Sequence, residues 1–164
     1  MAPGEAHPGE GLGQRDRDRA ARLSAYFDTS SLVKLVLAED GSPEAQRAWD
    51  SASARVASVA LIAEARAAVA AARRSGRVDP LNYATVLDDL AGLWQQIGGI
   101  VLTEGIAVRA GELADLCALR GYDAIHLASA EAILDEGDVM VVSDMRLAEA
   151  AAMLGIEALV PAEP

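Results

Sequence analysis

Short apolar runs alternate along the chain with longer segments in which apolar residues recur every three or four positions. The short runs predict β-strands over residues 25–27, 55–57, 100–102, 139–142 and 158–160. The longer segments predict helices that begin near residues 32, 43, 59, 79, 103, 123 and 147. Because strands and helices alternate, the pattern predicts a central parallel sheet in a three-layer α/β/α domain.

The first 24 residues do not share this pattern. They lack an apolar segment, and their four arginines balance four acidic residues. We expect residues 1–24 to form a disordered tail and residues 25–164 to fold as one domain. The net charge of -11 therefore belongs to the domain. An acidic domain of this kind argues against a general nucleic-acid coat protein, whose surface is basic.

The composition indicates which residues build the core and which cellular compartment is expected. Hydrophobic residues make up 52% of the chain and aromatic residues only 4%, so the core is built mainly from Ala, Leu and Val. Cys117 is the only cysteine, which excludes an intramolecular disulfide and favours a cytoplasmic protein. No segment approaches the roughly 18 uncharged apolar residues of a membrane span, so we expect no membrane partner.

Four acidic residues lie at the ends of predicted strands or in early turns of predicted helices: Asp28, Glu64, Asp123 and Asp144. Gly121 is expected to close one helix with a positive φ, which places Asp123 in the first turn of the next. Helix capping explains each aspartate taken singly, since aspartate is a favoured N-cap residue. It does not explain Glu64, which lies in the second turn of its helix among apolar neighbours.

Sites in parallel sheets form where the carboxyl ends of the strands meet, so these acids are expected to converge there. Four gathered carboxylates repel one another unless a cation neutralises them. Oxygen ligands suit Mg²⁺, or Mn²⁺ as an alternative. Such an ion activates a bound water and stabilises the oxygens that enter and leave during phosphodiester cleavage. The spacing therefore supports the hypothesis of a metal-dependent hydrolase.

Three stretches carry a resemblance to a known family. They are Tyr26–Leu35 (YFDTSSLVKL), Gly121–Ala130 (GYDAIHLASA) and Val141–Leu147 (VVSDMRL), with Glu64 between the first two. In this order they resemble PIN-domain proteins, and most closely the VapC group of toxins from type II toxin–antitoxin systems. The resemblance covers the chain from about residue 25 to its end. It implies a PIN-like fold and a Mg²⁺-dependent endoribonuclease, usually a homodimer, which a small antitoxin protein holds inactive.

The resemblance also implies roles for single residues. The four acids named above would be the catalytic metal ligands, and Ser30 an accessory polar group beside Asp28. One position departs from the family: many relatives carry a hydroxyl residue two places before the last acid, where this chain has Val142 and then Ser143. This departure, with the acidic composition, keeps open a rival interpretation. In it, a PIN-like module binds RNA or a protein partner without cutting.

Two further groups of residues have alternative interpretations. His126 lies one turn after Asp123 and is either a structural histidine, which an apolar helix favours, or a hydrogen-bonding neighbour of the site. Four arginines are concentrated on one predicted helix and its end: Arg66, Arg73, Arg74 and Arg77. They are either ordinary solvated surface or contacts for the RNA substrate. Arg66, Arg73 and Arg77 recur near the helical repeat and so predict a phosphate-facing stripe.

Overall fold

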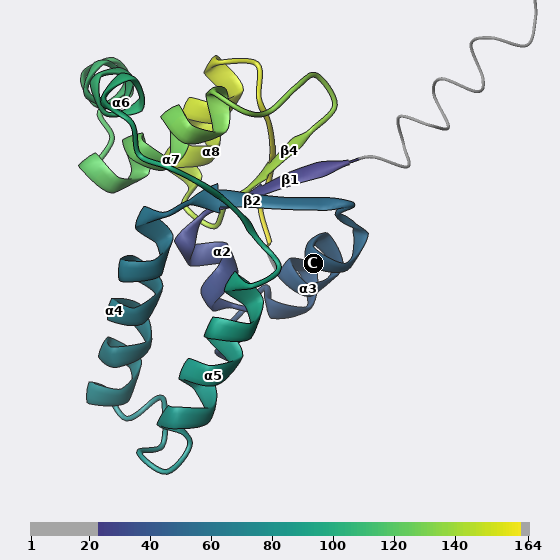
Figure 1. Cartoon of the computed structure of the whole chain (residues 1–164), viewed down its shortest axis with the longest axis vertical. Helices are drawn as coiled ribbons and strands as arrows, with labels where there is room; N and C mark the ends of the chain where they lie inside the picture. Colours follow the sequence, from purple (N-terminus) through teal and green to yellow (C-terminus); the bar gives the residue numbers. More distant parts are fainter. Residues whose placement is uncertain (1–22, 162–164) are drawn as a thin grey trace, which may run out of the picture.

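The computed structural model describes residues 23–161 and consists of one parallel sheet between two layers of helices (Figure 1). The five strands lie in the order β3-β2-β1-β4-β5, and every neighbouring pair is parallel. Their bounds are β1 Ser24–Phe27, β2 Ala54–Ser58, β3 Gly98–Ile100, β4 Val139–Val141 and β5 Glu157–Leu159. The predicted three-layer α/β/α architecture is confirmed.

The helices divide between the two faces of this sheet. Their bounds are α2 Thr29–Val33, α3 Ser42–Ser51, α4 Ala60–Arg74, α5 Tyr83–Trp94, α6 Glu104–Cys117, α7 Gly121–Glu131 and α8 Met145–Met153. Helices α2 to α5 cover one face, and α6 to α8 cover the other (Figure 1). Helices α4 and α5 pack on each other and extend away from the sheet as an arm (Figure 1).

The two central strands supply both cores, because successive side chains of a strand point to opposite faces. In β1, Phe27 enters the core under α2 to α5, whereas Tyr26 enters the core under α6 to α8. Val141 and Met140 of β4 divide between the faces in the same way. All four side chains are fully buried, as expected for central strands covered on both sides.

The third strand lies two residues before its predicted position at residues 100–102. Gly98 and Gly99 pair with β2 instead of merely ending the preceding helix. A Cβ atom on Gly99 would stand 3.1 Å from the ring of Trp94, at the end of α5. The absence of a side chain therefore lets α5 finish directly against the strand. The prediction was wrong because glycine in a strand marks such a close approach as well as a break.

The junction before α7 also differs from the prediction. Helix α6 ends at Cys117, and its C-cap residue Ala118 takes the left-handed conformation with a φ of 52°. Gly121, which was expected to close this helix, is instead the first residue of α7. Alanine seldom adopts a positive φ because its Cβ atom crowds the following carbonyl oxygen. Sequence propensity therefore pointed to the wrong residue.

At the N-terminus, β1 begins at Ser24, and Leu23 packs against the core under α2 to α5. Strand β1 therefore begins one residue before its predicted start at residue 25. The rest of the predicted disordered tail, residues 1–22, lies outside the described residues. Within residues 23–161, no helix has the length and apolarity needed to cross a membrane.

Candidate functional site

The four predicted acids line one cleft at the carboxyl edge of the sheet. The cleft has a volume of about 380 Å³ and receives Asp28, Glu64, Asp123 and Asp144 from four different segments. Asp28 follows β1, and Asp144 comes shortly after the neighbouring strand β4. The connection from β1 runs toward one side of the sheet and that from β4 toward the other. The cleft thus occupies the switch point where parallel sheets commonly bind ligands.

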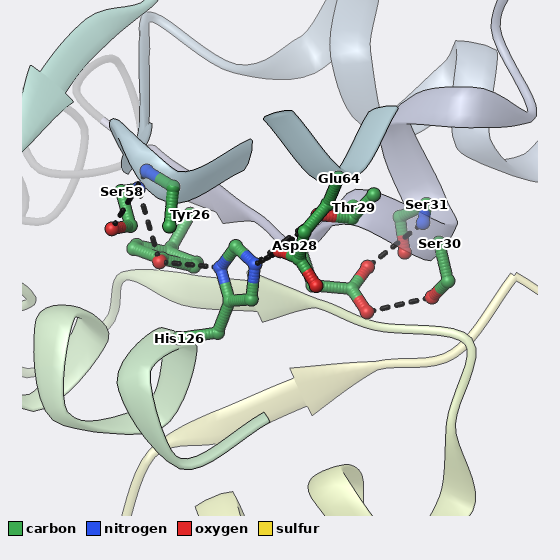
Figure 2. Close-up of polar contacts among 9 residues, drawn as sticks. Tyr26, Asp28, Thr29, Ser30, Ser31, Ser58, Glu64 and His126 are labelled. Carbon is green, nitrogen blue, oxygen red and sulfur yellow. Dashed lines mark hydrogen bonds and ion pairs between the residues drawn. The ribbon is translucent and has the colours of Figure 1, made fainter. Parts of the chain in front are cut away.

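Asp28 is the N-cap of α2 and is almost fully buried, with 5% of its surface exposed. Its Oδ1 accepts a hydrogen bond from the Ser31 backbone N–H at 2.8 Å. Its Oδ2 accepts another from the Ser30 hydroxyl at 2.6 Å (Figure 2). Burial raises the pKa of this carboxyl group, and the donors from Ser30 and Ser31 only partly oppose that shift. Ser30 thus lies beside Asp28 as predicted.

Asp144 caps a helix too, but in an exposed position. Its Oδ1 accepts hydrogen bonds from the backbone N–H groups of Arg146 at 2.8 Å and Leu147 at 3.2 Å. The two residues before this acid, Val142 and Ser143, face different surroundings. Val142 is fully buried in the core, whereas Ser143 lines the cleft. The Ser143 backbone N–H donates to the Ser30 hydroxyl at 3.2 Å, which connects the β1 and β4 ends of the site.

Glu64 projects from the second turn of α4 and is held by two side chains. The Thr29 hydroxyl donates to Glu64 Oε2 at 2.8 Å, and His126 Nε2 lies 2.7 Å from the same oxygen. Burial alone would raise the pKa of Glu64. The hydrogen bond and charge of His126, with the Thr29 hydroxyl, outweigh burial and lower it. Capping has no part in the position of Glu64.

His126 is buried, and both of its ring nitrogens have partners. Nδ1 lies 2.8 Å from the Tyr26 hydroxyl, and Nε2 lies 2.7 Å from Glu64 (Figure 2). The two interpretations of this residue are therefore compatible, because His126 is a satisfied histidine that also contacts a site acid. The sequence did not reveal Tyr26 or Thr29 as its neighbours. The only available signal was the position of these two residues on either side of Phe27-Asp28.

Asp123 is the third residue of α7, and Arg120 occupies the N-cap position. Simple capping, the easiest explanation for this aspartate alone, therefore does not apply. Its side chain is half-buried and makes no hydrogen bond within residues 23–161. Burial raises the pKa of Asp123, and the negative charges of Asp144 and Glu64 raise it further, against the opposing charges of Arg120 and His126. Asp144 and Glu64 thus disfavour the ionisation of Asp123.

The donor set fits a hard divalent cation. Among residues 23–161, no three acidic, histidine or cysteine side chains already form a compact metal cage. The cleft instead offers carboxylate oxygens from four segments, and the pKa values of Asp28 and Asp123 show that their ionised forms lack compensation. A cation would supply that compensation, and an all-oxygen set suits Mg²⁺ or Mn²⁺. Asp28, Glu64, Asp123 and Asp144 are the residues that would hold it.

The four predicted arginines do not share one surface. Arg77 lines the cleft and forms an ion pair with Glu39. Arg66 and Arg73 lie on α4 about 180–200° round the helix from Glu64, at roughly 100° per residue. Arg73 stacks on the ring of Tyr83 in α5, 4.6 Å from its centroid, and Arg66 lines a groove between α4 and α5. The remaining one, Arg74, is exposed at the end of α4.

The lysine and arginine side chains that line the cleft are Lys34 and Arg77, and the charge of Arg120 also acts on Asp123. Lys34 lies just after α2, lines the same cleft and donates from Nζ to the carbonyl oxygen of Asp40. Lys34 carries no sequence signal of its own, because one lysine in an apolar helix resembles an ordinary solvated side chain. Arg77 is the member of the predicted stripe that the fold brings to the site. The roles of all four arginines in binding remain predictions.

Fold and site together define an α/β protein with an acidic cleft at the carboxyl edge of a parallel sheet. Residues 25–153 match the family model described as PIN domain. Over 122 residues the chain is 42% identical to Ribonuclease VapC49 of Mycobacterium tuberculosis, which covers 74% of this chain and 85% of that protein. The chain therefore belongs to the PIN-domain family, and the resemblance to its VapC group is confirmed.

Solved structures agree on the fold. PAE2754 from Pyrobaculum aerophilum superposes with a TM-score of 0.61 at 20% identity, covering 83% of each chain. A toxin-antitoxin complex from Klebsiella pneumoniae gives a TM-score of 0.57 at 20% identity, covering 85% of this chain and 99% of the other. At this level of identity the likeness supports the fold alone.

Proposed function

We propose that the protein is a divalent-metal-dependent endoribonuclease and the toxin of a type II toxin–antitoxin pair. One observation carries the proposal: four acids from four separate segments line a single cleft, and one of them, Asp28, is buried with a raised pKa. Burying an ionisable carboxyl group costs stability, and helix capping alone does not require that burial. The match to relatives named ribonucleases supplies the substrate class.

The residues of the cleft divide the work. Asp28, Glu64, Asp123 and Asp144 would hold Mg²⁺, or Mn²⁺ as an alternative. When bound, the ion would neutralise charge on the scissile phosphate and lower the pKa of a water molecule. Ser30 and the Ser31 backbone N–H fix the orientation of the Asp28 carboxylate. Cleavage by a water-derived nucleophile would leave a 5′-phosphate on the product.

Cationic side chains around the acids would bind the RNA substrate. Arg77 and Lys34 line the cleft and would contact the phosphates of the RNA strand. Arg66, Arg73 and Arg74 would contact the strand only where it leaves the cleft along α4. Because the domain is acidic overall, these contacts would be local and strongly dependent on salt.

The same proposal includes two protein partners and a compartment. A cognate antitoxin protein would inhibit the enzyme; a structural relative is itself described as a toxin-antitoxin complex. A homodimer is supported by exposed apolar side chains on one layer of helices, with Val108, Leu116, Tyr122 and Ile133 all more than half exposed. An RNA-cleaving toxin would act in the cytoplasm.

Cleavage of a defined RNA in the presence and absence of divalent metal tests the proposal. We expect Mg²⁺ or Mn²⁺ to support cleavage, EDTA to abolish it, and the products to carry 5′-phosphates. Asp28→Asn, purified in parallel, controls for contaminating ribonuclease. RNA that stays intact with both metals, together with a melting temperature that Mn²⁺ does not change, would favour the rival non-catalytic module.

A further inference from the structure

We infer that Tyr26 and His126 form a buried pair that positions the Glu64 carboxylate for metal binding. The inference rests on the proposed function, because it assumes that Glu64 is a ligand. Neither residue belongs to the acid set: Tyr26 lies in β1 with no exposed surface, and His126 lies in α7 with 2% exposed. Figure 2 shows Tyr26, His126 and Glu64 in succession, from the interior of the protein toward the site.

The direction of each hydrogen bond follows from the donors available. The Ser58 backbone N–H donates to the Tyr26 hydroxyl oxygen at 3.1 Å, so the hydroxyl is free to give its own proton to His126 Nδ1 at 2.8 Å. At the other end, the ionised Glu64 carboxylate can only accept, and its Oε2 lies 2.7 Å from Nε2. The imidazole thus donates to Glu64 through Nε2–H, the ring nitrogen that faces the site.

This arrangement uses one oxygen of Glu64 and leaves the other for the cleft. Oε2 accepts from both His126 and Thr29, whereas no described residue donates to Oε1. A free glutamate side chain samples several rotamers, and a carboxylate anchored through one oxygen loses that freedom before a ligand arrives. Oε1 of Glu64 is therefore the oxygen that would be left for a metal.

The pair also couples two acids through one strand. Tyr26 and Asp28 are separated by one residue in β1, so the strand places Asp28 directly and Glu64 through the Tyr26–His126 contact. The rings of Tyr26 and His126 meet edge to face, with centroids 5.9 Å apart. Hydrogen-bonded partners of metal ligands typically change metal affinity by about 10–100-fold when removed. We assign Tyr26 and His126 this positioning role.

The tautomer can be tested without metal or RNA. Long-range ¹H–¹⁵N NMR separates protonated from unprotonated ring nitrogens, and the chain contains only two histidines, so a His7→Ala variant assigns the spectrum. We expect a proton on Nε2 of His126, the ring nitrogen that faces Glu64. Tyr26→Phe should move the Nδ1 resonance, whereas Tyr83→Phe, on α5, should not. An Nε2 without a proton, which could not donate to Glu64, overturns the inference.

Calorimetric titration with Mn²⁺ tests the consequence for the site. Tyr26→Phe and His126→Leu should weaken binding by about tenfold or more, whereas His126→Gln, whose amide can still donate toward Glu64, should recover part of the loss. Thr29→Val against Thr29→Ser provides a second pair if a histidine variant does not fold. If His126→Leu and Thr29→Val both bind Mn²⁺ with unchanged affinity, the positioning role is wrong, whereas the proposed function is unaffected. A parent protein that binds no Mn²⁺ overturns the proposed function, while the tautomer result still stands.

Discussion

The ends of β1 and β4 make an instructive pair, because they are neighbours in the sheet with similar local structure and different environments. Each strand leads to an aspartate that caps the following helix, Asp28 for α2 and Asp144 for α8. Asp28 is buried, and both of its oxygens accept hydrogen bonds. Asp144 is exposed, and only its Oδ1 is used for capping.

This difference shows that capping and metal binding are not competing explanations. Both aspartates cap, so the presence of a cap cannot identify the functional acid. Burial can, because an ionised carboxylate in a buried position lowers stability unless a cation or other charge compensates it. Asp28 therefore carries a cost that its cap does not require, and Asp144 carries almost none. We therefore expect a substitution of Asp28 to change cleavage and stability more than the same substitution of Asp144.

Asp28→Asn should have the largest effect on cleavage. Asparagine caps well and stays neutral, so the α2 junction should survive. Loss of a ligand should remove several kcal/mol of the stabilisation that the metal gives the transition state. At about 1.4 kcal/mol per tenfold, the cleavage rate should fall roughly 100-fold or more. RNA cleavage in saturating Mn²⁺ measures it. Cleavage at the parent rate would show that Asp28 is only a cap.

The stability of the same variant should change in the opposite direction when metal is absent. Burial raises the folded-state pKa of Asp28 above its unfolded value. The contribution of Asp28 to stability is therefore full below the unfolded pKa and is lost as pH rises through the folded pKa. Asparagine avoids that loss, so metal-free Asp28→Asn should unfold at the parent temperature or higher near neutral pH. Mn²⁺ should then stabilise the parent much more than the variant.

Asp144→Asn should have a smaller effect, about tenfold on cleavage, because an exposed acid with one committed oxygen contributes less to a shared site. Its stability should stay within about 0.5 kcal/mol of the parent, since asparagine also caps. Asp144→Ala, which removes the cap, should cost about 1 kcal/mol of unfolding free energy. Denaturant titration distinguishes the two. Equal stability of the Asn and Ala variants would contradict the capping role.

The sequence predicted those features of the fold and site that depend on local pattern. Apolar runs identified β1, β2, β4 and β5, because a covered parallel strand must be apolar whatever its partners are. The run at residues 100–102 shares only Ile100 with β3. Strand ends and the first two turns of helices determine which edge of the sheet a residue reaches, and this rule located Asp28, Glu64, Asp123 and Asp144. Gly98 and Gly99 were misassigned, since strand pairing uses backbone atoms that a glycine also has. Ala118 was missed because its left-handed conformation opposes its propensity.

Contacts between distant segments could not be predicted from one sequence. Tyr26 and His126 are 100 residues apart, and neither strand nor helix periodicity relates them. The arginine stripe illustrates the same limit. A helical repeat placed Arg66 and Arg73 together correctly, but only the packing of α4 on its neighbours decides which face meets the acids. Arg77 reaches the cleft because α4 ends at Arg74 and the chain turns there.

Arg77→Ala should weaken RNA binding modestly. It tests whether the RNA strand runs through the cleft, beside the ends of β1 and β4, or along α4. Loss of one phosphate contact should reduce the slope of log K against log salt by about one. Arg66→Ala is the matched control, because Arg66 lies on the far side of α4 in the groove toward α5. Equal changes of slope in both variants would place the RNA along the arm instead of the cleft.

Ser30→Ala should have the smallest effect on cleavage, and it tests the connection between the two junctions. The Ser30 hydroxyl donates to Asp28 Oδ2 at 2.6 Å and accepts from the Ser143 backbone N–H at 3.2 Å. Its removal leaves a part-buried carboxylate oxygen and a backbone N–H without their partner, which should cost about 1–3 kcal/mol of unfolding free energy. All four acids remain, so cleavage should fall less than about tenfold. Ser143→Ala is the control, because the Ser143 hydroxyl makes only a 3.4 Å contact with that of Ser31. If Ser143→Ala destabilised the protein as much as Ser30→Ala, the Ser143 hydroxyl would contribute as much to the connection as the Ser30 hydroxyl.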